Sequence, residues 1–272
     1  MMEREPGKRY VLAFSGGKDS TYLLYEILQR KMPLDEIRFL DATLEYPVTY
    51  AWLDEIERRF NVKITRYKSP INFMDRFNKV RIKGTKIGKI RGFPPSNSGC
   101  WIQSDMKLKQ RPNGKDEFVY VGIAANEAAR KNQDKTNILT PLIDWGVTED
   151  MIRTRLQELD LVPPYYKMGF RRSGCWLCPY QPRGSLYLLW KHFPDLWARL
   201  KELEALSPHG FKDGVVLSKL EIRFQNEPER YAPHFCKTCG APGVLLGTGR
   251  IKKQQDFCPR HYEENKKTEI HP

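Results

Sequence analysis

The sequence predicts an α/β fold, in which a doubly wound parallel sheet carries a helical extension and a small C-terminal zinc ribbon. Three observations predict this architecture. Short apolar runs alternate with amphipathic helical patterns over about the first 180 residues. The first apolar run ends in a glycine turn that leads directly into a helical pattern. From about residue 231, cysteines recur at the spacing of metal ligands.

The alternation of strands and helices can be followed along the chain. The expected strands are short apolar runs, at residues 9–14, 36–40, 62–67 and 118–122. The expected helices between and after them have apolar residues at helical spacing, at residues 20–30, 49–60 and 149–159. Two further helices rich in Leu and Trp, at 185–192 and 195–206, form the helical extension. This order predicts a parallel sheet covered by helices.

The composition limits the classes of protein to which the chain can belong. The 272 residues include 40% hydrophobic residues, which is enough for a core and excludes wholesale disorder. The net charge of +13 favours a polyanionic partner, either a nucleic acid or a highly charged nucleotide. No stretch has the roughly 20 apolar residues of a membrane helix, and the N-terminus has no apolar signal-peptide centre, so we expect a cytoplasmic protein without membrane contact.

One basic segment stands between the expected strands. Residues 76–91 carry seven positive charges and no acid, with two glycines. The pattern predicts a mobile arm or a hairpin. Two interpretations stay open at this point, a solvated loop and a surface that contacts phosphates.

The glycine turn after the first strand has the chemistry of a phosphate-binding loop. Its glycines allow a tight turn whose N–H groups approach an anion, and the following helix directs its positive end at the same point. A lysine and two serine hydroxyls add donors. The residues expected to bind nucleotide are Ser15, Gly16, Gly17, Lys18, Asp19 and Ser20. The alternative is a glycine turn that only caps the helix.

Polar residues after two later strands are further candidates. Asp41 and Glu45 lie at or just beyond a strand's carboxyl end, where open α/β sheets place ligands. Asp41 is expected to hold Mg²⁺ or a ribose; capping the next helix is the alternative. Glu127 and Arg130 follow the strand at 118–122. Arg130 can bind phosphate with its planar fork, or form a surface ion pair with Glu127.

Six cysteines in a reducing compartment point to metal binding rather than to disulfides. Cys100 and the pair Cys175/Cys178 stand in two near-identical Ser-Gly-Cys-Trp segments, and Pro179 follows the last thiol. Three cysteines from two loops suit a 4Fe–4S cluster with one open iron. Zinc and unligated thiols are the alternatives.

The C-terminal cysteines predict a separate zinc site. The ligands would be Cys236, Cys239, Cys258 and His261, two pairs with 18 residues between them. The intervening segment is glycine-rich and has few apolar residues, so Zn²⁺ would stabilise it. The module is basic, and it is either a phosphate-gripping appendage or a purely structural clip.

Several segments resemble a known family. Residues 15–20 resemble the pyrophosphatase loop of the adenine nucleotide alpha hydrolase superfamily, the PP-loop. The segments that are similar to the phosphoadenosine phosphosulfate reductase family within it are 39–47, 122–130, 141–145, 163–166 and 174–179. Ala124 replaces the arginine usual in the family. The resemblance extends over about residues 8–183 and includes DNA phosphorothioation and tRNA thiolation enzymes, so it implies ATP as a cofactor.

The resemblance and the residues together give a functional hypothesis. We expect an ATP-dependent sulfurtransferase that adenylylates and thiolates a nucleic acid, DNA or tRNA, with Lys18 and Asp41 as catalytic residues. The expected partners also include a sulfur donor such as a cysteine desulfurase, and a second copy of the chain in a homodimer. The C-terminal cysteine tail of thioredoxin-dependent reductases does not occur in the sequence. Sulfonucleotide reduction is the first alternative, and a non-catalytic ATP-sensing module that binds nucleic acid is the second.

The same reasoning divides the chain into three consecutive domains. Residues 1–183 are expected to form the PP-loop nucleotide-binding domain with the iron–sulfur site. Residues 184–230 are expected to form the helical extension, and residues 231–272 the zinc-ribbon module.

Overall fold

The computed structural model describes residues 3–84, 86–95, 99–110, 116–131 and 136–233. These residues form two compact units, each assembled from separate stretches of the chain. Unit 1 comprises the described residues of Met1–Asp41, Pro47–Lys68 and Arg111–Lys167, and unit 2 those of Ala42–Tyr46, Ser69–Gln110 and the chain from Met168 onward. Within the described ranges, no helix is both long and apolar enough to cross a bilayer.

Unit 1 is built on a five-stranded sheet in which every pairing is parallel. The strands are β1 (Arg9–Ala13), β2 (Glu36–Asp41), β3 (Ile64–Lys68), β4 (Glu117–Val121) and β5 (Ile138–Leu139), in the order β3-β2-β1-β4-β5. In the central strand, Leu12 is paired with Ile37 of β2 and with Tyr120 of β4. The order reverses between β1 and β4, which makes their carboxyl ends the topological switch point where such sheets bind ligands.

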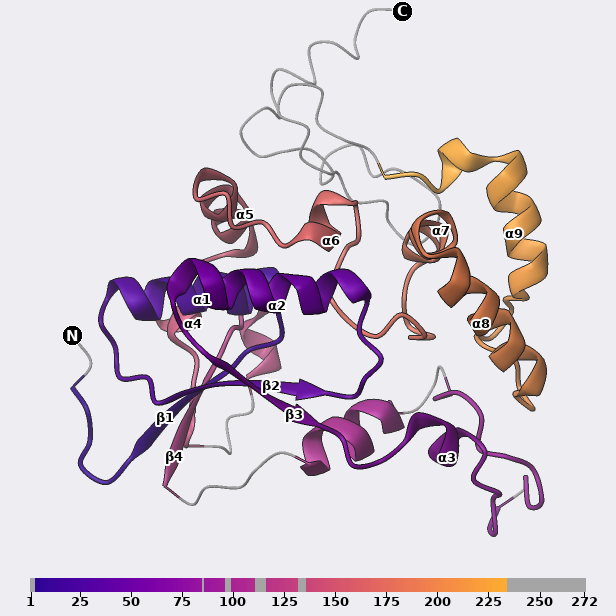
Figure 1. Ribbon diagram of the computed structural model, residues 1–272, viewed down its shortest axis with the longest axis horizontal. Helices are drawn as coiled ribbons and strands as arrows, with labels where there is room; N and C mark the ends of the chain where they lie inside the picture. The colour runs from indigo at the N-terminus through magenta and orange to yellow at the C-terminus, as the bar shows by residue number, and fades with distance from the viewer. Residues whose placement is uncertain (1–2, 85, 96–98, 111–115, 132–135, 234–272) are drawn as a thin grey trace, which may run out of the picture. The chain divides into compact units, whose positions relative to one another are not determined.

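The helices of unit 1 pack on this sheet. They are α1 (Lys18–Gln29), α2 (Pro47–Phe60), the 3₁₀ segment η3 (Ala125–Arg130), α4 (Pro141–Asp144), α5 (Glu149–Glu158) and α6 (Pro164–Lys167). Figure 1 shows α1 and α2 on the same side of the strands, with α5 beyond α1. Both crossovers β1–α1–β2 and β2–α2–β3 run in one direction along the sheet, so right-handed connections put both helices on one face.

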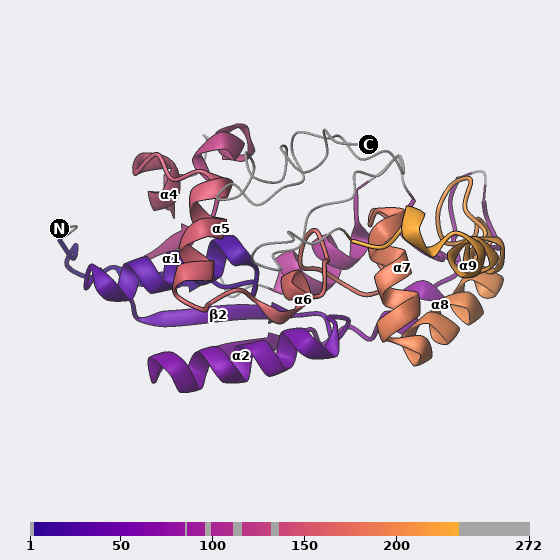
Figure 2. The same cartoon turned by 90° about the horizontal axis from the view of Figure 1, so that it is seen from above.

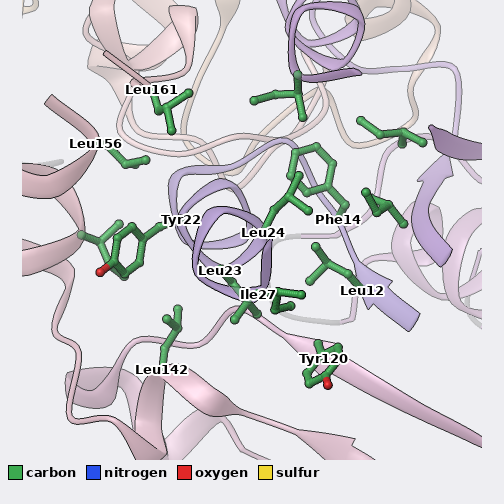
Figure 3. Close-up of a cluster of buried hydrophobic side chains, with 14 of the residues drawn as sticks. Leu12, Phe14, Tyr22, Leu23, Leu24, Ile27, Tyr120, Leu142, Leu156 and Leu161 are labelled. Atoms are coloured by element: carbon green, nitrogen blue, oxygen red, sulfur yellow. The ribbon is translucent and has the colours of Figure 1, made fainter. Parts of the chain in front are cut away.

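The core of unit 1 lies between the sheet and these helices. Alternate residues of a strand point to the same face, and Leu12 and Phe14 of the first strand segment contribute to one buried cluster. From α1, Leu23, Leu24 and Ile27 enter the same cluster (Figure 3). All five side chains are at most 2% exposed. This packing fixes the start of α1 against the end of β1, which positions the loop between them.

Unit 2 is mainly helical. Its helices are α3 (Phe73–Phe77), the π-helix η1 (Ile102–Lys107), the 3₁₀ segments η2 (Leu108–Gln110) and η4 (Pro228–Arg230), α7 (Arg183–His192), α8 (Pro194–Leu206) and α9 (Leu217–Asn226). Figure 2 shows α7, α8 and α9 grouped together. Aromatic rings fill the unit: Phe93 meets Phe77 and Phe211 edge to face, at centroid distances of 5.3 Å and 5.1 Å.

A hairpin projects from unit 2 between α3 and η1. Val80 and Ile90 form an antiparallel bridge in it. We call the described residues of 79–91 the basic hairpin. The sequence allowed either an arm or a hairpin here, and the bridge confirms the hairpin.

The structure confirms the expected α/β class and parallel sheet, which are consistent with a doubly wound fold. Each expected strand and helix of the sheet region is present, with ends that differ by a few residues. The short helices α3, α4, α6 and η1, and the two-residue strand β5, were not expected, because each contains fewer than two periods of a pattern, too few to show a repeat. The predicted zinc ribbon lies outside the described residues, and the three consecutive domains stay a prediction.

Candidate functional site

The loop between β1 and α1 forms a closed turn in unit 1. Gly16 has a φ of +71°, in the left-handed region that favours glycine. The Ser20 hydroxyl donates to the carbonyl of Gly17 at 3.0 Å and accepts from the N–H of Ser15 at 3.2 Å. The hydroxyl of Ser15 accepts from the N–H of Gly17 at 3.3 Å. These bonds hold the turn at the first turn of α1, where the helix presents its N–H groups and positive end to an anion.

The carboxyl end of β4 approaches this loop closely. A Cβ atom on Gly122 would lie 2.9 Å from the carbonyl carbon of Asp19 and 2.9 Å from the amide nitrogen of Ser20. Cβ atoms in proteins do not come so close to backbone atoms. The backbone of Asp19 and Ser20 cannot move away by a rotamer change, as a flexible side chain can. Glycine is therefore required at this point, and the loop sits at the switch point between β1 and β4.

Helix α6 supports the loop from another side. The hydroxyl of Tyr165 donates to the carbonyl of Gly16 at 2.9 Å. Tyr165 is 1% exposed, so this bond is shielded from water. The sequence singled out the segment 163–166 only by resemblance, and the structure gives its tyrosine a physical role in holding the glycine turn.

Lys18 is nearly buried and lies between two carboxylates. Its Nζ is 3.0 Å from both oxygens of Asp19 and 2.6 Å from an oxygen of Glu149 at the start of α5. Burial opposes the charged form, yet electrostatic interactions with Tyr166, Asp19 and Glu149 raise the pKa of Lys18. For Asp19, burial raises the pKa, and the nearby Lys18 counters this. Lys18 is therefore a fixed positive charge at the loop.

Three carboxylates at this loop could hold a metal ion. Oxygens of Asp19, Glu127 and Glu149 all lie within 4.8 Å of one another. Carboxylate oxygens are the ligands that Mg²⁺ prefers, usually together with phosphate oxygens and water. The donor set therefore fits Mg²⁺ bound with a nucleotide. Glu149 was not expected from the sequence, because 131 positions separate it from Lys18 and its place at a helix start gives no sign of the loop.

Other expected residues of the nucleotide site have different surroundings. The carboxylate of Asp41, at the end of β2, is buried and accepts a hydrogen bond from the hydroxyl of Tyr50 at 2.8 Å. Arg130 is exposed and pairs with Glu127, as the alternative interpretation had it. Its contact with phosphate and the role of Asp41 in binding Mg²⁺ or ribose stay predictions.

The three cysteines of the predicted cluster come together in unit 2. Cys175 forms an antiparallel bridge with Glu45, and its Sγ lies 3.9 Å from an oxygen of that carboxylate. A turn follows, in which the N–H of Cys178 donates to the carbonyl of Cys175 at 3.2 Å. Cys100 precedes η1, and its carbonyl accepts from the N–H of Ser104 in that helix at 3.0 Å. All three thiols are free and partly buried.

The thiols interact electrostatically with one another. Burial raises the pKa of Cys175 well above its ordinary value, and the nearby Glu45, Cys178 and Cys100 raise it further. Burial also raises the pKa of Cys178, with Cys100 contributing in the same direction. A cluster of thiols that resist ionisation separately becomes a good ligand set once a metal supplies positive charge.

The spacing of the thiols bears on which metal group fits. Among the described residues, the three sulfurs do not form a group within 4.8 Å of one another, whereas the carboxylates above do. Thiolates on one tetrahedral zinc lie about 3.8 Å apart, as a Zn–S bond of about 2.3 Å requires. A cubane cluster takes one thiolate on each of three irons and spreads the sulfurs farther. The three sulfurs therefore do not surround one point as the ligands of a single zinc ion do, and the 4Fe–4S cluster stays a prediction.

Glu45 lies beside Cys175 in unit 2. Its carboxylate is buried, accepts from Nζ of Lys107 in η1, and faces Cys175. Lys107 could not be found from the sequence, because a single lysine in a basic chain has no distinguishing pattern. The nucleotide-binding role that the sequence predicted for Glu45 stays a prediction.

The expected zinc ligands cannot be placed. Cys236, Cys239, Cys258 and His261 lie outside the described residues. The zinc site stays a prediction.

Residues 9–91 match the phosphoadenosine phosphosulfate reductase domain. The chain is 25% identical over 221 residues to the uncharacterized protein MJ0066 of Methanocaldococcus jannaschii, which covers 77% of this chain and 44% of that protein. It is 24% identical over 228 residues to the uncharacterized protein MJ0973 of the same organism, with 77% and 51% covered. The chain thus spans about half the length of these curated relatives.

Among solved structures, the chain resembles the U34-tRNA thiolase NcsA from Methanococcus maripaludis with its 4Fe–4S cluster. The match covers 95% of this chain and 81% of that one, at 14% identity and a TM-score of 0.37.

Proposed function

Because the chain carries a phosphoadenosine phosphosulfate reductase domain over residues 9–91, we propose that it is an ATP-dependent sulfurtransferase that adenylylates and thiolates a nucleic acid. The observation that carries the proposal is the loop site, where Lys18 and three carboxylates gather at the switch point of the sheet. The three thiols of unit 2 supply the second requirement, a place for sulfur chemistry.

The loop site is suited to release pyrophosphate from ATP. The N–H groups of the turn bind phosphate oxygens, and the fixed charge of Lys18 stabilises the negative charge that develops on the leaving group. Mg²⁺ held by Asp19, Glu127 and Glu149 would neutralise phosphate charge and orient the triphosphate. The hydroxyl of Tyr165 keeps the glycine turn in place while the reaction proceeds.

The proposed reaction has two displacements. An oxygen of the nucleic acid attacks the α-phosphorus of ATP, the bond to the β-phosphate oxygen breaks, and pyrophosphate leaves. Hydrosulfide then attacks the activated atom, the bond to the AMP oxygen breaks, and AMP leaves with its electron pair. The product carries sulfur where the oxygen was, and no electrons are exchanged.

The cysteine site is where we place the supply of sulfide. Cys100, Cys175 and Cys178 would hold the 4Fe–4S cluster, whose open iron would bind sulfide. Lys107 and Glu45 form a charge pair beside Cys175. A cysteine desulfurase as sulfur donor also belongs to this proposal, together with a pair of external thiols that reduce its persulfide sulfur to hydrosulfide and become a disulfide. The homodimer and the zinc module belong to it as well.

The experiment that tests the proposal is pyrophosphate release with and without DNA or RNA. The wild-type protein should release pyrophosphate from ATP, faster with its nucleic acid. The Lys18→Ala variant should lose release by at least about a hundredfold, the effect of removing a preorganised charge, and should keep its iron. Lys63→Ala removes an exposed lysine of the same unit and should change neither. Turnover that persists in Lys18→Ala contradicts the assignment of the loop.

A second candidate function is supported by the family match itself. The domain that matches residues 9–91 takes its name from sulfonucleotide reduction. Sulfite released from adenosine phosphosulfate or phosphoadenosine phosphosulfate, without stimulation by nucleic acid, would favour this reaction over sulfur transfer. A protein silent in both assays would be the ATP-sensing module.

A further inference from the structure

The basic hairpin is an ordered element with regular backbone pairing. The N–H of Arg81 donates to the carbonyl of Lys89 at 3.0 Å, and the N–H of Arg91 donates to the carbonyl of Lys79 at 2.9 Å. The function proposed above does not yet use this hairpin, although its charge is concentrated and of one sign.

The cations of the basic hairpin have no acidic neighbours in sequence. Residues 76–91 contain no Asp or Glu. Within the described part of the chain, five cations of the hairpin form no ion pair with a carboxylate, namely Lys79, Arg81, Lys83, Lys86 and Lys89. Like charges held together on a short hairpin repel one another, and a bound polyanion would relieve that repulsion.

The same hairpin exposes large apolar side chains. Val80 is 50% exposed, Ile82 80% and Ile87 64%. Apolar side chains between cations are typical of surfaces that contact the sugars and bases of a nucleic acid while lysines bind its phosphates. The apolar residues therefore point to the same partner as the charge.

The base of the hairpin is fixed to the helix that follows Cys100. The guanidinium groups of Arg76 and Arg91 both pair with the buried carboxylate of Asp105 in η1. The guanidinium of Arg91 also lies over the ring of Trp101, 4.9 Å from its centroid. These two arginines are thus used for anchoring. The half-buried Arg81 donates to the carbonyl of Arg91 at 3.1 Å within the hairpin. The exposed cations left for a ligand are Lys79, Lys83, Lys86 and Lys89.

Helix η1 also contacts the cysteine site, through its last residue and through the segment just before its first. Lys107 pairs with Glu45, whose carboxylate faces Cys175. Cys100 itself lies two residues before η1 begins. One short helix thus connects the base of the basic hairpin to two of the three cysteines within unit 2. A polymer bound on the hairpin would therefore be held at a fixed position relative to these two thiols.

We propose that the basic hairpin binds the phosphodiester backbone of the nucleic-acid substrate, with Ile82 and Ile87 against sugars or base edges. The inference rests on the proposed function, which makes a nucleic acid the substrate. The inference adds to that function the structural element, the basic hairpin, that binds the polymer. An acidic membrane surface also attracts lysines, but three exposed apolar side chains bury too little area for membrane insertion, and anchoring beside the cysteines serves no purpose there.

The test is fluorescence anisotropy with labelled tRNA, duplex DNA and single-stranded DNA over a range of salt concentrations. The variant Lys83→Gln/Lys86→Gln/Lys89→Gln should bind about a hundredfold more weakly at physiological salt. The slope of log affinity against log salt should fall by about 2 to 3, since each lost phosphate contact contributes about 0.7 to 0.9. Ile82→Ser should weaken binding several-fold without changing the slope, because it removes no charge.

A matched control removes three lysines elsewhere. Lys63, Lys191 and Lys219 are exposed and lie outside the basic hairpin, and their triple Gln variant has the same net charge as the hairpin variant. It should keep most of the wild-type affinity. Equal loss in both triple variants would mean that net charge alone attracts the polymer, and it would overturn the proposal. Urea unfolding midpoints and iron content of both variants show that each is folded.

The titrations with tRNA, duplex DNA and single-stranded DNA identify which polymer the hairpin binds. A hairpin-dependent loss with tRNA, with either DNA, or with several of them supports the proposal and names the polymer. Unchanged nucleic-acid binding, with binding to phosphatidylserine vesicles lost instead, would overturn it in favour of a membrane surface. Binding of the polymer requires neither ATP nor sulfide. If the wild-type protein binds nucleic acid through the hairpin but does not thiolate it, the proposed function is refuted and the assignment of the hairpin as a binding element is retained.

Discussion

The clearest energetic prediction concerns Asp105, the carboxylate that anchors the basic hairpin. It is 5% exposed and pairs with Arg76, Arg91 and Lys109. Burial works against its charge, yet hydrogen bonds and the charges of these cations lower the pKa of Asp105 from 3.8 to about 2. Each pKa unit corresponds to about 1.4 kcal/mol. The ion pairs therefore stabilise the folded state by about 2 kcal/mol at neutral pH.

The pH dependence follows from the direction of the shift. A carboxyl whose pKa is lowered on folding contributes its stability above its unfolded value, and loses it as the pH falls through the folded value. The variant Asp105→Asn lacks the charge at every pH. The stability difference between wild type and variant should therefore be about 2 kcal/mol near pH 7 and should fall away between about pH 4 and about pH 2.

The assay is urea unfolding followed by tryptophan fluorescence, since four of the six tryptophans lie in unit 2. With a slope of about 2 kcal/mol per molar urea, Asp105→Asn should lower the midpoint by about 1 M at neutral pH. Asp75→Asn removes an exposed carboxylate two residues into α3 and is the matched control. Equal midpoints for the two variants would refute the argument that Asp105 holds the base of the hairpin.

Three further predictions concern the two candidate sites. Gly122→Ala should weaken ATP binding about tenfold by calorimetry, because its Cβ meets loop backbone at 2.9 Å, whereas Gly99→Ala enters open space and should bind normally. Glu149→Gln should raise the Mg²⁺ concentration for half-maximal pyrophosphate release about tenfold, with the exposed Glu158→Gln as control; identical titrations would remove Glu149 from the cation site. Cys178→Ser should lower the iron bound after anaerobic reconstitution, and full iron content would contradict its role as a ligand.

The sequence predicted the frame of unit 1 well because local patterns specify it. The apolar run at β1, the glycine turn and the helical spacing of α1 are each contained in about a dozen residues. The loop residues from Ser15 to Ser20 could be identified for the same reason. Nothing beyond the neighbouring side chains is needed to recognise a strand that turns tightly into a helix.

The parts that sequence analysis missed depend on residues that are distant in the chain. Glu149 reaches Lys18 only through the packing of α5 on α1, and a glutamate in the first turn of a helix is common. Asp105 sits in a π-helix, a rare element without a sequence pattern of its own. Glu45 could not be assigned to the cysteines, because its bridge to Cys175 joins residues 130 positions apart.

The charges of the loop site explain why a divalent cation and a nucleotide would have to bind together. Asp19, Glu127 and Glu149 contribute three negative charges to the loop site, and Lys18, Arg130 and Arg153 pair with these carboxylates. A triphosphate at the loop N–H groups would still lie beside three carboxylates, which repel its own negative charges. Mg²⁺ at the proposed site would satisfy the carboxylates and bring positive charge to the phosphates at once. The same carboxylates raise the pKa of Lys18 and keep it charged, so the proposed site would take a metal–nucleotide complex rather than free ATP.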